Sequence, residues 1–74
     1  MEINKKVLLL AIYKKEPQEA LLDVIAMLEN SHLFTRKEGK KLLKELKEED
    51  LVNAAGLTVK GMVLARNIEE EFKL

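Results

Sequence analysis

The chain has no cysteine and one histidine, His32, among its 74 residues. Disulfide bonds and thiolate metal sites are therefore excluded, and so is a metal site built from several histidines. A domain of this size rarely gains more than ~3–5 kcal/mol of stability from its core alone. Self-association is then the remaining common source of added stability. We therefore expect a single domain, residues 1–74, that would gain stability as a dimer.

Turn-forming and aromatic residues are also scarce, with three glycines, one proline and 4% aromatics. Few glycines and prolines predict few turns and much helix. The aromatic residues Tyr13, Phe34 and Phe72 are scattered along the chain. Proteins that bind single-stranded nucleic acid use aromatic side chains as stacking platforms, and this spacing does not predict one.

Long apolar segments are missing as well. The longest apolar run, Val7 to Tyr13, has seven residues, against the ~20 that a membrane-spanning helix needs. Lys14, Lys15 and Glu16 follow this run where a secretory signal would carry a small-residue cleavage site. We therefore expect a cytoplasmic protein without a membrane partner.

Net charge is absent too, because 13 basic residues balance 13 acidic ones. The charge is nevertheless unevenly distributed. Residues 36–47 hold six basic and two acidic residues, and the acidic residues gather at 48–50 and 69–71. On a helix at ~100° per residue the six basic residues fall within one arc of about 140°, and the leucines fall opposite. A concentrated positive face on a neutral chain indicates a binding surface.

The apolar periodicity predicts four helices and one short hairpin. The first helix covers residues 3–15, and its apolar residues surround it on all sides, as in a central core helix or one that also meets a partner. The second begins with Pro17 at its first position, where the missing N–H has no cost, and ends at Asn30 and Ser31. The third runs from Thr35 to about Glu48, a hairpin covers residues 51–58, and the last helix covers residues 59–72.

Local signals support two of these helix starts. Thr35 and Glu38 have the spacing of a capping box, and Thr58 is a good N-cap for the last helix. Gly39 costs about 1 kcal/mol in a helix interior. Since Gly39 lies on the apolar side, we expect it to allow close approach of another segment.

This order of elements, with two short stretches, resembles the winged-helix superfamily. Residues 41–52 look like the end of a recognition helix that enters the first strand of the wing. Gly56-Leu57-Thr58-Val59-Lys60-Gly61 is similar to the Leu-Thr-x-x-Gly entry to the helix after the wing in small bacterial and archaeal members. The resemblance implies a mainly α fold, with a three-helix helix-turn-helix core, a short β-hairpin wing and a C-terminal helix.

The resemblance also implies a function, that of a DNA-binding protein of the kind that regulates transcription. Such a protein places its third helix in the major groove and dimerises through its first and last helices. Carried over by position, the residues that contact duplex DNA are Thr35, Arg36, Lys37, Lys40, Lys41 and Lys44. Arg36 is the best candidate for a base contact, because arginine pairs with guanine. Lysines mainly contact phosphates, which position a protein without specifying sequence.

Two other interpretations of the basic face stay open. It is a solvated helix surface if Lys41–Glu45 and Lys44–Glu48 pair at i,i+4, or it docks an acidic protein. His32 lies in a predicted turn without a partner that would orient it for catalysis. Consecutive acidic residues on a helix point in different directions. We therefore expect no catalytic site, no metal and no cofactor.

Overall fold

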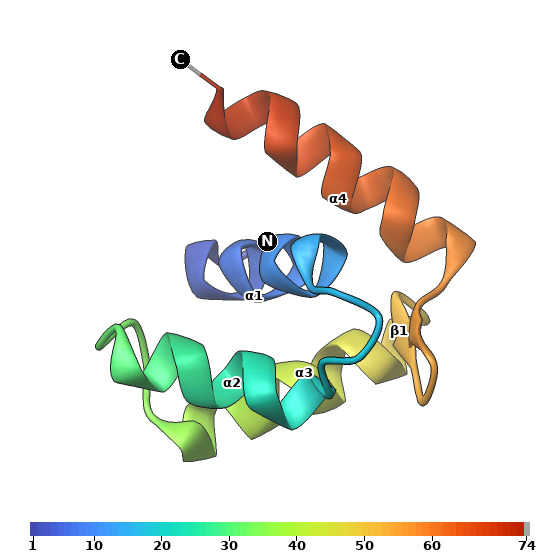
Figure 1. Ribbon diagram of the computed structural model, residues 1–74. Helices are drawn as coiled ribbons and strands as arrows, with labels where there is room; N and C mark the ends of the chain where they lie inside the picture. The colour runs from blue at the N-terminus through green and yellow to red at the C-terminus, as the bar shows by residue number, and fades with distance from the viewer. Residues whose placement is uncertain (74) are drawn as a thin grey trace.

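The computed structural model describes residues 1–73 and is mainly helical. Its elements follow in the order α1 (Ile3–Lys14), α2 (Leu21–Asn30), α3 (Arg36–Glu48), β1 (Val52–Asn53), β2 (Gly56–Leu57) and α4 (Val59–Phe72). Helix α1 lies in the middle, with α4 on one side and α2 and α3 on the other (Figure 1). This arrangement confirms the expected fold class of three helices, a short antiparallel hairpin and a C-terminal helix.

The central position of α1 explains why its sequence is apolar on all sides. Leu8, Leu9 and Ile12 are buried in the core, and the neighbouring apolar residues of the helix pack against it. The helix contacts α2, α3, α4 and β2. Of the two interpretations of this sequence, burial within the domain accounts for its apolar character.

The start of α2 differs from the prediction. The helix begins at Leu21, and Pro17 lies in the preceding turn, where the Glu19 amide donates to the Glu16 carbonyl at 3.0 Å. Proline fits the second position of such a turn as well as it fits the first turn of a helix. The Asp23 carboxylate accepts a hydrogen bond from the Ala20 amide at 3.1 Å, which satisfies a backbone donor at the true helix start. Helix α1 ends one residue earlier than predicted, at Lys14.

Helices α2 and α3 end in the same way, with a non-glycine residue in the left-handed region. His32 has φ 62° and Asp50 has φ 61°. After each of them the next amide donates back into the helix, from Leu33 to Leu28 at 3.1 Å and from Leu51 to Leu46 at 2.9 Å. These are Schellman caps, in which glycine is the usual left-handed residue.

The hairpin is anchored where α3 ends and α4 begins. Val52 pairs with Leu57 and Asn53 with Gly56 in an antiparallel ladder. The Thr58 hydroxyl accepts from the Gly61 amide at 3.0 Å, which confirms the predicted N-cap of α4. A Cβ built on Gly61 would lie 1.9 Å from the carbonyl oxygen of Leu51, so only glycine fits at this crossing.

We predict that Gly61→Ala destabilises the fold by about 3 kcal/mol or more, because overpacking against backbone forces the chain apart. The comparison is Gly39→Ala, where a Cβ would meet side-chain atoms of Ile25 and Phe34 at 2.7 Å. Because side chains shift more easily than backbone, Gly39→Ala is expected to lose less stability than Gly61→Ala. Chemical denaturation measures both, and equal losses would contradict the close approach at Leu51.

We predict that Asp50→Gly stabilises the protein by about 0.5–1 kcal/mol, because glycine adopts the left-handed conformation without steric cost. Glu48→Gly is the matched control, since it removes the same charge two residues earlier, at the last residue of α3. There glycine lowers helix propensity, so that variant loses stability. Urea midpoints that move in the same direction for both variants would argue against this cap.

Candidate nucleic-acid interface

Helix α3 is held in place by its cap and by its apolar side. The Thr35 hydroxyl accepts from the Glu38 amide at 3.2 Å, which is one of the two hydrogen bonds of the predicted capping box. Gly39, Leu42, Leu43 and Leu46 are buried, and a Cβ on Gly39 would collide with neighbouring side chains. The tight packing that was expected at Gly39 is therefore present.

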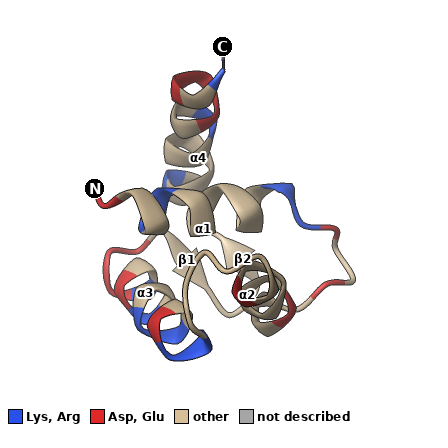
Figure 2. Ribbon diagram, turned by 90° about the vertical axis from the view of Figure 1, so that its left-hand side faces the viewer, with Lys and Arg blue, Asp and Glu red and all other residues tan. Residues whose placement is uncertain are grey.

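The opposite side of α3 is basic and open to solvent. Figure 2 shows its lysine and arginine positions gathered on the side that faces away from α1. The residues predicted to contact DNA are all exposed, namely Thr35, Arg36, Lys37, Lys40, Lys41 and Lys44. Lys47, which follows them on α3, is exposed as well. The structure thus brings all six together on one surface.

Arg36 is not free on this surface. One carboxylate oxygen of Glu29 lies 3.3 Å from the guanidinium, and the other accepts the Arg36 backbone amide at 3.0 Å. The side chain of Arg36 remains 60% exposed, so the pair is accessible to solvent. Exposed pairs of this kind contribute ~0–1 kcal/mol. Arg36, the best candidate for a base contact, is therefore paired with Glu29 of α2, and this exposed ion pair can readily give way to another partner.

The lysines of α3 are arranged differently. Within residues 1–73, Lys37, Lys40, Lys41, Lys44 and Lys47 make no ion pair. The i,i+4 pairs that would mark an ordinary solvated helix face are thus missing from the described part of the chain. The basic arc is left with several uncompensated charges.

Lys5 of α1 accounts for one of those missing pairs. Its ammonium lies 3.2 Å from Glu45 and also pairs with Glu49, and its side chain is only 12% exposed. Hydrogen bonding to the Glu49 carboxylate, with a smaller contribution from Glu45, raises the pKa of Lys5 above its usual value although desolvation opposes this. Lys5 therefore stays charged at neutral pH and neutralises acids that would otherwise border the lysines of α3.

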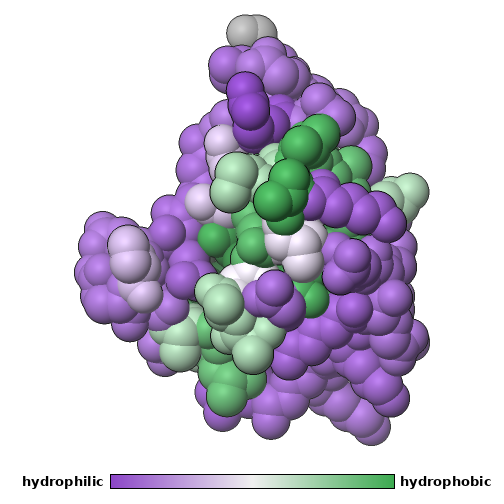
Figure 3. Space-filling model, turned by 90° about the vertical axis from the view of Figure 1, so that its right-hand side faces the viewer, coloured by the Kyte–Doolittle hydropathy of each residue, from purple (hydrophilic) through white to green (hydrophobic). Residues whose placement is uncertain are grey.

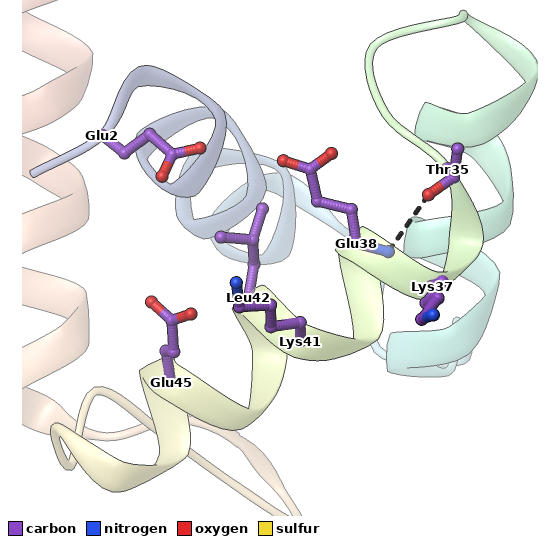
Figure 4. A pocket seen from close by; sticks show the side chains of 7 residues that line it. All are labelled: Glu2, Thr35, Lys37, Glu38, Lys41, Leu42 and Glu45. Atoms are coloured by element: carbon purple, nitrogen blue, oxygen red, sulfur yellow. Dashed lines mark hydrogen bonds between the residues drawn. The ribbon is translucent and has the colours of Figure 1, made fainter.

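A groove of about 490 Å³ separates the start of α1 from the adjoining edge of α3. The side chains of Glu38, Leu42 and Glu45 point from α3 toward the start of α1, where Glu2 lies (Figure 4). Glu45 is already paired with Lys5, so Glu2 and Glu38 are the carboxylates that weaken the positive potential on this edge, beside Lys37 and Lys41. Lys40 and Lys44 lie outside this groove's lining. No group of side chains in the described residues can hold a metal ion.

Two other sequence features fall outside this surface. His32 is exposed in the turn after α2, where its left-handed backbone serves the helix end. The hairpin tip, Asn53, Ala54 and Ala55, is exposed and uncharged. Neither the turn at His32 nor the hairpin tip therefore adds a lysine or arginine to the basic face of α3.

Comparison with known proteins adds no relative, since no family model, curated protein or solved structure matches this chain. None of the helices within residues 1–73 is long and apolar enough to cross a membrane. Fold and charge distribution are therefore the basis for inferring a function.

Proposed function

We propose that this protein is a small winged-helix-like transcriptional regulator that binds duplex DNA in the cytoplasm through the basic face of α3. The observation that carries the proposal is the cluster of exposed lysines on α3 without ion-pair partners in the described chain. On a chain with zero net charge, this cluster is a strong local attraction for a polyanion. The order of helices and hairpin supports the same function by resemblance.

The chemistry of the surface favours phosphates over bases. Lysine ammonium groups neutralise phosphates as point charges, and each contact releases a bound counterion from DNA. The surface has one arginine, Arg36, which Glu29 already holds. Binding in which Lys40, Lys41 and Lys44 contact the backbone is therefore expected to show weak sequence preference.

The positions of the aromatic residues favour duplex DNA over single-stranded nucleic acid as the ligand. Phe34 is buried and Tyr13 is half-buried. Phe72, which is exposed, lies on α4 and not on the basic helix. Without an aromatic platform beside the lysines, stacking of unpaired bases has no support on this surface.

We predict that Lys40→Ala/Lys44→Ala lowers the steepness of log K against log salt for duplex DNA by about 1.8, at 0.9 for each lost phosphate contact. Fluorescence anisotropy across a salt series measures this slope. The matched control is Lys6→Ala/Lys14→Ala, which loses the same charge from α1, where both lysines pair with acids of α4. The control is expected to retain the wild-type slope. No binding at low salt, or equal slopes for all three proteins, would refute the proposal.

We predict that Glu29→Gln strengthens DNA binding severalfold, because it frees the Arg36 guanidinium and removes a negative charge beside it. Glutamine keeps a carbonyl oxygen that can accept the Arg36 amide, so the start of α3 is preserved. Titrations at fixed salt give the affinity, with Glu70→Gln on α4 as the control for loss of one acid. Unchanged affinity in Glu29→Gln would place Arg36 outside the contact.

A protein–protein interaction module that uses the basic face or the C-terminal helix is the second candidate. It is favoured by the uncharged hairpin tip, which offers DNA no second positive contact. An acidic protein surface would then occupy the basic face. Pull-down with nuclease treatment separates the two functions, because a partner that stays attached after nuclease does not depend on DNA.

A further inference from the structure

Helix α4 has an apolar surface that the core does not use. Gly61, Ala65 and Ile68 are buried, whereas Val59 is 80% exposed and Val63 53% exposed. Figure 3 shows apolar side chains gathered on the face where α4 begins, with hydrophilic residues around them. Exposed apolar groups that cluster in this way mark an interaction surface.

A groove runs along this surface. It has a volume of about 420 Å³ and is lined by Leu51, Lys60, Val63, Leu64 and Asn67. Leu64 is half-buried and offers apolar surface to an incoming side chain, whereas Leu51 is only 3% exposed and offers little. Four of the five lining residues belong to α4, at a spacing that places them on one side of the helix.

The charges along this side of α4 have opposite signs at its two ends. Lys60 lies in the first turn and donates to the Glu49 carbonyl oxygen at 3.2 Å, which holds it beside the groove. Glu70 lies in the last turn, and its partner is the exposed Lys73 at 3.0 Å. Apolar Val63 and Leu64 lie between Lys60 and Asn67. When two such helices run antiparallel, with the two-fold axis at the level of residue 65 along each helix, Lys60 lies level with Glu70 of the other copy and Val63 lies level with Asn67.

We propose that the occupant of this groove is a second copy of the chain, with the two α4 helices antiparallel and Val63 of each copy entering the groove of the other. A two-fold contact requires a surface that complements itself, and the order basic, apolar, polar, acidic meets this requirement. The Glu70–Lys73 pair is exposed to solvent and therefore weak. Glu70 can therefore give up Lys73 and pair with Lys60 of the second copy at little cost in free energy.

The expected dimer is weak. A standard interface takes about 800 Å² from each partner, which is about one sixth of the 4950 Å² surface of this domain. One face of a 14-residue helix, about 21 Å long, supplies less than that. We therefore expect dissociation at low micromolar concentration and association toward the millimolar range. The groove does not include the basic face of α3, so the inference stands whether or not the protein binds DNA.

Analytical ultracentrifugation of the full chain over this concentration range tests the proposal with a charge exchange. Lys60→Glu alone and Glu70→Lys alone each place like charges opposite one another, so each is expected to lose at least tenfold in self-association. An equimolar mixture restores both pairs in a heterodimer and is expected to recover wild-type association. Circular dichroism checks that each variant keeps its helical fold.

A second pair of variants tests the apolar contact. Val63→Gln is expected to weaken association at least tenfold, whereas Met27→Gln, which changes an exposed apolar residue of α2, leaves it unchanged. A wild-type protein that stays monomeric at every concentration would overturn the proposal and leave the groove to a different protein. It would also be overturned if the single charge variants associate as well as wild type, or if their mixture gains nothing.

Discussion

The fold depends on the backbone of Leu51. Its amide donates to the Leu46 carbonyl at 2.9 Å and closes the end of α3, and its carbonyl accepts the Thr58 amide at 3.1 Å. Its side chain is buried in the core. Gly61 of α4 rests so close to this carbonyl that a Cβ would overlap it. One residue therefore fixes the end of α3, the hairpin and the start of α4, and so relates the basic face to the groove on α4.

The sequence predicted those features that are encoded within one helical turn. Thr35 and Thr58 were identified as caps because each hydroxyl accepts from an amide only three residues further on. The inner leucines of α3 followed from their periodicity. The start of α2 was predicted wrongly because Pro17 suits a turn as well as a helix start. The left-handed ends at His32 and Asp50 had no glycine to indicate them.

Apart from Glu70–Lys73, the ion pairs of the described residues could not be predicted, because they join residues that are separated in sequence. Lys5 meets Glu45 and Glu49 only once α1 packs beside α3, and Glu29 reaches Arg36 across the turn between α2 and α3. The six candidate residues were identified from sequence and do share one surface. Which of them are free and which are paired depends on tertiary packing.

These distant pairs explain how a chain with no net charge exposes a positive face. Three lysines of α1 engage acids of α3, of its C-cap and of α4, namely Lys5 with Glu45 and Glu49, Lys6 with Glu71, and Lys14 with Glu69. Each exposed pair contributes little to stability. Their main effect is on the distribution of charge over the surface, because acids that pair with lysines of α1 cannot neutralise the lysines of α3. If that face grips phosphates, as we propose, one domain makes few contacts and binds weakly. Joining two such faces through α4 would make the second binding event intramolecular and raise the affinity without a new kind of contact.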